Sequence, residues 1–151
     1  LLQDPRRQPD QDHPLLPGQK HPGLGCLKII IGMLVMAAER LGYDGLTVVP
    51  SHFHVAAQSK RLMGFLDPVD EARFVAMLQA TAGLSLLDAS HALDGGAVVD
   101  PQSGEPVRYQ PMRLAAPTSE KLRARLKSPA YARAVEQAAR ELALTGTRTA
   151  G

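Results

Sequence analysis

The fold is decided by residues 21–65, which read HPGLGCLKIIIGMLVMAAERLGYDGLTVVPSHFHVAAQSKRLMGF. The stretch begins with a turn that contains two glycines and continues into a long apolar segment. Hydrophobic residues recur there three and four positions apart, which predicts a helix over 24–41 that stops at Gly42. Because apolar side chains occupy nearly the whole circumference of this helix, we expect it to be buried on more than one face.

A short strand and two further helices are predicted next. The run GLTVVP at 45–50 is rich in β-forming residues and suits a buried strand that its proline closes. Residues 52–63 predict a second helix. Asp67 followed by Pro68 is typical of an N-cap with proline at the first helical position, which predicts a third helix over 67–81.

The rest of the chain is predicted to be mostly helical, with each helix marked by its cap. We expect a helix from Ser85 to Gly95-Gly96, a β-hairpin over 97–114, a helix capped by Thr118 or Ser119, and a helix that begins at Ser128-Pro129 and ends near Leu144.

Length and composition indicate one globular domain. The chain has 151 residues, of which 44% are hydrophobic and 21% charged, so it can bury one core. We divide it into an extended, proline-rich lead-in (1–14), a globular domain (15–145) and a frayed tail (146–151). Within the domain, 15–66 form the core and 67–145 add helices and the hairpin. The chain opens on Leu-Leu without an initiator methionine, which predicts that it begins inside a longer protein.

Charge and residue usage exclude several classes of function. A net charge of +2 and a pI near 8.9 suit a small anionic ligand. The absence of tryptophan, an aromatic content of 4% and an only mildly basic balance argue against nucleic-acid binding, and the basic run SEKLRARLK at 119–127 is read as a solvated helix face, with a phosphate-binding surface as the alternative. The longest apolar run, at 29–38, is too short to cross a bilayer. A single cysteine, Cys26, excludes an internal disulfide, and we expect a cytoplasmic protein.

The turn KHPGLG at 20–25 is a candidate anion-binding site. A helix N-terminus leaves backbone N–H groups unpaired and carries a partial positive charge, and glycines let the backbone approach a pyrophosphate closely. A simple tight turn is the alternative. Cys26 lies at the helix start, where a thiol becomes more acidic, so it is a candidate nucleophile. The apolar run that follows favours a buried structural role instead.

Residues 15–66 resemble the core of the GNAT acetyltransferase superfamily. In that family a Gln/Arg-x-x-Gly-x-Gly/Ala turn opens a helix, and a segment Asn-x-x-Ala-x-x-x-Tyr-x-x-x-Gly-Phe follows the next strand. KHPGLG (20–25) is similar to the first motif. FHVAAQSKRLMGF (53–65) is similar to the second and matches it at Ala56, Gly64 and Phe65. The same residues also resemble uncharacterised bacterial proteins.

The resemblance implies a protein that transfers an acyl group from an acyl-coenzyme A to an amine acceptor. Its cofactor, coenzyme A or acetyl-coenzyme A, would lie on the turn. Phe53 replaces the family's asparagine, and Lys60 replaces the tyrosine that many members use as general acid. Lys60 adjoins Arg61 and is predicted on a solvated helix face. The residues implied to bind the cofactor are Lys20, Gly23, Leu24, Gly25 and Cys26.

His52 and His54 flank Phe53 just after the predicted strand, where ligands of α/β proteins collect. We take both histidines as candidate catalytic residues, with one of them deprotonating the amine acceptor. The alternatives are capping or surface histidines, or half of a metal site. Because no His pair at helical spacing and no paired cysteines are present, we predict no metal site. Ser51 is a candidate N-cap or nucleophile.

These observations predict an α/β fold in the α+β sense, with a small mixed sheet covered by helices, a GNAT-like core and a mostly helical C-terminal part. Three functions stay open. The first is an acyl-coenzyme A-dependent N-acyltransferase. The second is a non-catalytic structural or interaction domain that forms a homodimer, which Phe53, Lys60 and the apolar first helix favour. The third is a histidine-dependent hydrolase or metal enzyme.

Overall fold

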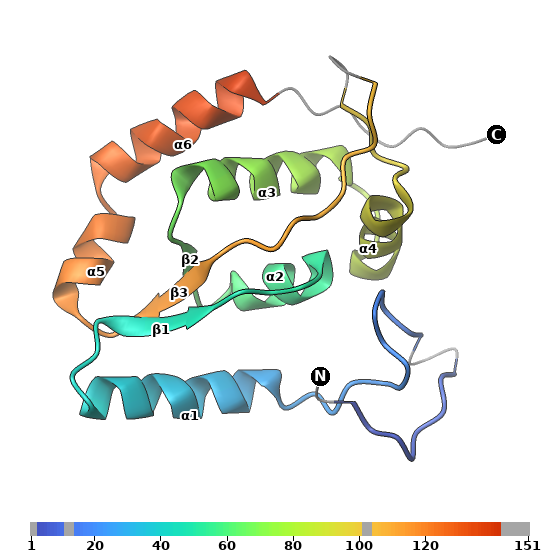
Figure 1. Cartoon of the computed structure of the whole chain (residues 1–151), viewed down its shortest axis with the longest axis horizontal. Coiled ribbons are helices and arrows are strands. Elements are labelled where there is room, and N and C mark those ends of the chain that lie inside the picture. The colour runs from blue at the N-terminus through green and yellow to red at the C-terminus, as the bar shows by residue number, and fades with distance from the viewer. Residues whose placement is uncertain (1–2, 11–13, 101–103, 143–151) are drawn as a thin grey trace.

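A computed structural model of the chain describes residues 3–10, 14–100 and 104–142. Figure 1 shows a small sheet with helices arranged around it. The described elements, in chain order, are α1 (Leu27–Arg40), β1 (Gly45–Val48), α2 (Phe53–Ser59), β2 (Gly64–Phe65), α3 (Pro68–Ala80), α4 (Leu86–Gly95), β3 (Leu114–Pro117), α5 (Glu120–Leu126) and α6 (Pro129–Glu141). The predicted α+β class is confirmed.

The three strands form a sheet in the order β1-β3-β2, and both pairings are antiparallel. The sheet is therefore antiparallel rather than mixed. The last strand in the chain, β3, lies in the middle. Its Leu114 faces Val48 of β1 on one side and Phe65 of β2 on the other. The sheet consequently depends on pairings between segments that are far apart in sequence.

The core lies between this sheet and the helices. All three phenylalanines of the chain meet there, with ring centres 5.3 Å apart for Phe53 and Phe74 and 5.1 Å apart for Phe65 and Phe74. Burying such large apolar side chains supplies the main driving force for folding. The largest fully buried side chains are those of Phe65, Phe74, Leu93, Met112, Leu114 and Val98.

Helix boundaries follow the predicted caps. Asp67 accepts a hydrogen bond from the Val69 amide at 2.9 Å. Ser85 accepts from the Asp88 amide and donates to the Asp88 carboxylate, which makes a reciprocal capping pair. The serines before α5 and α6, Ser119 and Ser128, also accept from amides of the first turn. Local side-chain chemistry thus determines where four of the helices begin.

Three elements of the structure are shorter than the sequence predicts. The first helix begins at Leu27, because Gly25 has a φ of 69° and interrupts the helical backbone. The helix predicted over 52–63 ends at Ser59, and the following Gly64–Phe65 pair with β3. The predicted hairpin is reduced to one antiparallel bridge between Val99 and Pro106. Its turn at 101–103 lies outside the described residues, as do 143–151, which include the predicted tail.

The prediction that the first helix is buried on more than one face is wrong. In α1 only Ile31 and Ala38 are buried, with Leu27 and Val35 packed partly against the core. These positions lie on one face, since side chains three and four residues apart share a side of a helix. Four large apolar side chains of α1 are exposed, those of Ile29, Met33, Leu34 and Met36.

None of the helices in the described part of the chain is both long enough and apolar enough to cross a membrane.

Candidate functional site

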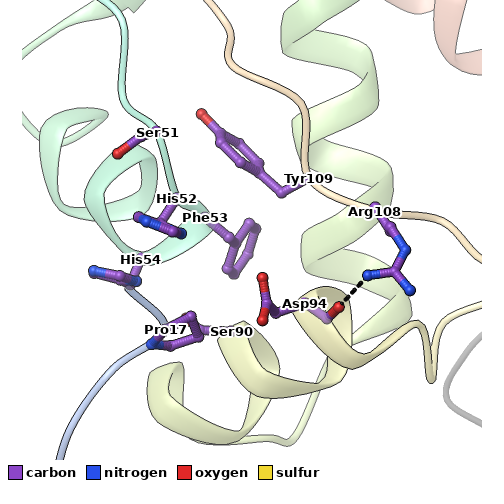
Figure 2. A pocket seen from close by; sticks show the side chains of 9 residues that line it. All are labelled: Pro17, Ser51, His52, Phe53, His54, Ser90, Asp94, Arg108 and Tyr109. Carbon is purple, nitrogen blue, oxygen red and sulfur yellow. Dashed lines mark hydrogen bonds between the residues drawn. The ribbon is translucent and has the colours of Figure 1, made fainter. Parts of the chain in front are cut away.

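The candidate site is a cavity of about 110 Å³ between α2, α4 and the segment that precedes β3 (Figure 2). Four stretches of the chain meet there: the segment before α1, the α2 region, α4 and the residues before β3. Most of the side chains are polar, which distinguishes the cavity from a packing defect in the core. The residues that line it are Pro17, Ser51, His52, Phe53, His54, Ser90, Asp94, Arg108 and Tyr109.

The structure brings the two predicted histidines together. His52 is the N-cap of α2 and has an extended backbone, whereas His54 lies in the first turn of the helix. Their ring centres are 5.6 Å apart and their planes differ by 11°, so the imidazoles are stacked. The change from extended to helical backbone between them allows two side chains, two positions apart, to point the same way.

His54 is a buried, neutral imidazole. Only 4% of its surface is exposed, and its Nδ1 atom has no hydrogen-bond partner in the described part of the chain. Burial, together with charge repulsion from the nearby His52 and His91, lowers the pKa of His54 from 6.5 to about 4. An unpaired nitrogen inside a protein is costly, so this atom is a candidate for contact with a ligand.

The low pKa of His54 predicts a loss of stability in mild acid. As the pH falls, the unfolded imidazole takes up a proton near its ordinary pKa of 6.5, while the folded one stays neutral until about 4. Its contribution is therefore complete above pH 6.5 and is lost as the pH falls toward 4. Between about pH 7.5 and pH 5, we expect the free energy of unfolding to drop by about 2 kcal/mol through this group.

Urea denaturation of the wild type and of His54→Asn at both pH values measures this contribution. The variant should lack this part of the pH dependence, whereas His91→Asn, a change at an exposed histidine, should retain most of it, because burial is the main cause of the shift. An identical pH dependence in the wild type and His54→Asn would contradict the assignment of a neutral buried imidazole.

The segment before α1 that contains Pro17 and Gly18 covers the histidines. Pro17 lines the cavity, and a Cβ atom placed on Gly18 would lie 2.2 Å from Nε2 of His52. Gly18 also has a φ of 77°, a conformation that side chains other than glycine rarely adopt. The same segment is attached to α4, since a ring nitrogen of His91 lies 3.2 Å from the Leu15 carbonyl oxygen.

The opposite wall comes from α4 and from the strand-like segment before β3. The Tyr109 hydroxyl donates to the Pro50 carbonyl at 3.1 Å, and burial raises the pKa of Tyr109 to about 12. The Arg108 guanidinium donates to the Asp94 carbonyl at 2.7 Å. Figure 2 shows the Asp94 carboxylate directed into the space beside Phe53. These residues were not predicted, because no sequence spacing connects them to the histidines.

The turn at 20–25 is partly occupied by the chain itself. The Gln3 side-chain oxygen accepts hydrogen bonds from the Lys20 and His21 amides, both at 2.8 Å. Gly23 forms an antiparallel bridge with Gln3. The lead-in therefore satisfies two amides of this turn.

The part of the turn next to α1 is more open. A Cβ atom placed on Gly25 would meet nothing within 4 Å, and Leu24 is exposed. Cys26 is the N-cap of α1 and is half-buried rather than buried, and no side chain caps this helix. The residues implied to bind coenzyme A thus form a surface that is separate from the histidine cavity, which none of them lines.

Lys60 does not lie on a solvated helix face, so that expectation is wrong. Its Nζ atom pairs with the Glu71 carboxylate at 2.5 Å and lies 5.2 Å from the centre of the Phe65 ring. The Tyr131 hydroxyl is 2.8 Å from the other Glu71 oxygen and 2.7 Å from the Phe65 carbonyl, and burial raises its pKa. Lys60 therefore helps to connect α2 with α3 and α6.

No protein-family model matches the chain, and neither a curated protein nor a solved structure matches it. The resemblance of residues 15–66 to the acetyltransferase core stays a prediction. Within the described ranges, no group of three or more histidine, cysteine, aspartate or glutamate side chains is arranged to hold a metal ion. Fold and site together define an α+β domain with a small polar cavity built around a histidine pair.

Proposed function

We propose that the protein binds a small amine-bearing molecule in the histidine cavity. The observation that carries this proposal is the buried, neutral His54, which lines a cavity that also contains a carboxylate and whose Nδ1 has no hydrogen-bond partner among the described residues. In the tautomer with the proton on Nε2, Nδ1 is an acceptor and pairs with an N–H group. The Asp94 carboxylate supplies the charge that attracts an ammonium group.

The charge state of the histidines favours a cation over an anion. A bound cation stabilises neutral imidazoles, whereas a bound carboxylate would favour their protonation. The existing low pKa of His54 therefore matches an amine ligand. Ser51 adds a further hydroxyl to the lining.

Size restricts the ligand. A water molecule takes up about 30 Å³ in the liquid, so a cavity of about 110 Å³ admits a molecule of roughly four to six non-hydrogen atoms. Small ligands gain at most about 1.5 kcal/mol per non-hydrogen atom, and typical ones gain less, so we expect millimolar to micromolar affinity. A nucleotide cofactor does not fit in this cavity.

His54 orients the amine rather than deprotonating an ammonium group. An imidazole with a pKa of about 4 is a weak base, and an alkylammonium has a pKa of about 10, so proton transfer between them would cost about 8 kcal/mol. Binding needs no such transfer, because an N–H of the ammonium group that Asp94 attracts can donate a hydrogen bond to Nδ1 of His54. Catalysis of acyl transfer at this site would then rest on positioning the amine.

Titration with two probes of similar size, ethylamine and acetate, tests the proposal. The His54 ring resonances followed by NMR should shift saturably with ethylamine, and the pKa of His54 should fall further. Asp94→Asn should weaken this binding at least tenfold, because it removes the carboxylate without changing the shape of the side chain. Asp44→Asn, which removes a carboxylate outside the cavity, is the control.

Saturable binding of acetate with a rise in the pKa of His54 would contradict the proposal, because it would identify an anion site. A response to neither probe at high millimolar concentration would also contradict it, since the cavity would then hold only water.

A second candidate function, acyl-coenzyme A binding for transfer to an amine, is favoured by one observation. The N-terminus of α1 has no side-chain cap, and the space beside Gly25 is open. Coenzyme A or acetyl-coenzyme A phosphates would lie near the Leu24, Gly25 and Cys26 amides, with Lys20 supplying positive charge. The large cofactor would lie on this surface and not in the histidine cavity.

A thermal-shift titration with coenzyme A tests the second candidate. A ligand that binds only the folded protein raises its stability by about 2.7 kcal/mol at 100 times the dissociation constant. We expect a rise in the unfolding temperature that Lys20→Glu reduces. An unchanged unfolding temperature at millimolar coenzyme A would exclude this function and leave the amine proposal unaffected.

A further inference from the structure

The outward face of α1 is apolar. Ile31 and Ala38 point to the sheet, and at 100° per residue the positions directly opposite them are Ile29, Met33 and Met36. These three side chains are 66%, 60% and 54% exposed. Figure 1 shows α1 at the border of the molecule, with the sheet on one side of it and no other helix on the other.

This face is unusual for a helix at a surface. A surface helix normally turns charged and polar side chains toward water, opposite its buried face. Beyond the helix, Leu41 and Tyr43 are also exposed, at 70% and 62%. Large apolar side chains gathered on one exposed helix face mark an interaction surface.

We propose that α1 packs antiparallel against α1 of a second copy of this chain, across a two-fold axis. Charge placement argues for this partner. Lys28 and Glu39 are about three turns apart and therefore lie on the same flank of the apolar stripe, near opposite ends of the helix. A two-fold axis perpendicular to two antiparallel helices places the N-terminal end of each helix beside the C-terminal end of the other. The flank that carries Lys28 and Glu39 then lies on the same side of the dimer in both copies. Lys28 of each copy then lies beside the partner's Glu39, twice in the dimer.

Gly32 fits this arrangement. It lies on the same flank, between the two charged positions, and a Cβ atom placed on it would meet nothing within 4 Å. Glycine inside a helix costs about 1 kcal/mol relative to alanine. A glycine that faces a second helix lets the two backbones approach, which compensates for that cost in close helix pairs.

The size of the surface sets the expected affinity. A helix of 14 residues is about 21 Å long, so the α1 pair alone buries less than the roughly 800 Å² per partner of a standard interface. Leu41 and Tyr43 extend the contact beyond the helix. We therefore expect a dimer with a dissociation constant in the micromolar range, stabilised by its apolar centre and specified by its charged flanks.

Sedimentation velocity at protein concentrations between 1 and 100 μM tests the inference, with variants in which the charges at positions 28 and 39 are reversed. Lys28→Glu and Glu39→Lys should each weaken the dimer about tenfold, because each places like charges side by side at both of the contacts between residues 28 and 39. The double variant Lys28→Glu/Glu39→Lys should restore the wild-type dissociation constant, since it rebuilds both pairs with reversed sign. Lys121→Glu, the same charge change at an exposed residue of α5, should leave the dimer unaffected.

A further variant addresses the apolar centre. Met33→Glu should give a monomer with an unchanged circular dichroism spectrum, because this side chain is exposed and does not support the core. A wild-type monomer at 100 μM would overturn the inference, and so would a dimer that the charge exchanges do not affect. Larger open assemblies would also overturn it, since a two-fold contact closes on itself. None of these outcomes bears on the histidine cavity, to which α1 contributes no residue.

Discussion

Replacing Phe53 by asparagine, the residue that the acetyltransferase motif has at this position, is expected to lower the free energy of unfolding by about 4 kcal/mol. Phe53 is 3% exposed, its ring lies 5.3 Å from that of Phe74, and it contacts Tyr109 edge-on at 6.3 Å. The change removes a large aromatic side chain from the core and buries an amide whose hydrogen bonds would be incompletely satisfied. Urea denaturation near pH 7.5 measures the loss.

Phe53→Leu is the matched control. Leucine keeps an apolar side chain at the same site, so we expect a smaller loss of about 1–2 kcal/mol. The difference between the two variants isolates the cost of the polar group. A Phe53→Asn protein as stable as the wild type would mean that this position tolerates the family's asparagine and that the phenylalanine cluster does not hold the domain together.

The second large effect is expected for Gly18→Ala, at about 3 kcal/mol of destabilisation. The added methyl group would have to lie 2.2 Å from Nε2 of His52, and the backbone would have to keep a φ of 77°. Either His52 moves or the covering segment lifts from α2. Chemical denaturation measures the stability, and NMR of the His52 ring reports the displacement.

Gly25→Ala separates the two causes. Gly25 has a similar φ of 69°, but a Cβ atom there meets nothing within 4 Å. We expect only the backbone strain of about 1 kcal/mol, with His52 resonances unchanged. Equal losses in the two variants would show that the segment around Gly18 does not pack against His52 as the structure describes.

The parts of the fold that depend on local chemistry were predictable from the sequence. Asp67-Pro68, Ser85, Ser119 and Ser128 mark helix starts because a side-chain oxygen satisfies free amides within three residues. Gly96 stops α4 because it adopts a φ of 73°. Strand β1 was predictable from its β-rich composition.

The remaining fold depends on contacts that sequence spacing does not reveal. Leu114–Pro117 form the central strand only because two distant segments pair with them. The sequence around 97–114 predicts a hairpin, but Pro106 and Pro111 remove amide donors that a long ladder would need.

The site was predictable only in part. His52 and His54 follow a predicted strand, and that position alone made them candidates. Asp94 and Arg108 reach the cavity through tertiary packing, so no motif identifies them. The neighbouring Arg61 led to the prediction that Lys60 lies on a solvated helix face. In the structure Lys60 pairs with Glu71, which lies on another helix and which no sequence spacing identifies.

The central position of β3 has a consequence for how the chain is made. While the ribosome has produced only β1 and β2, neither strand has its neighbour, since each pairs with β3 alone. The nascent chain must therefore hold two unpaired strands until residues 114–117 leave the exit tunnel, and domains dominated by such distant pairings fold slowly. During that interval the unpaired strand edges are open to pairing with other chains.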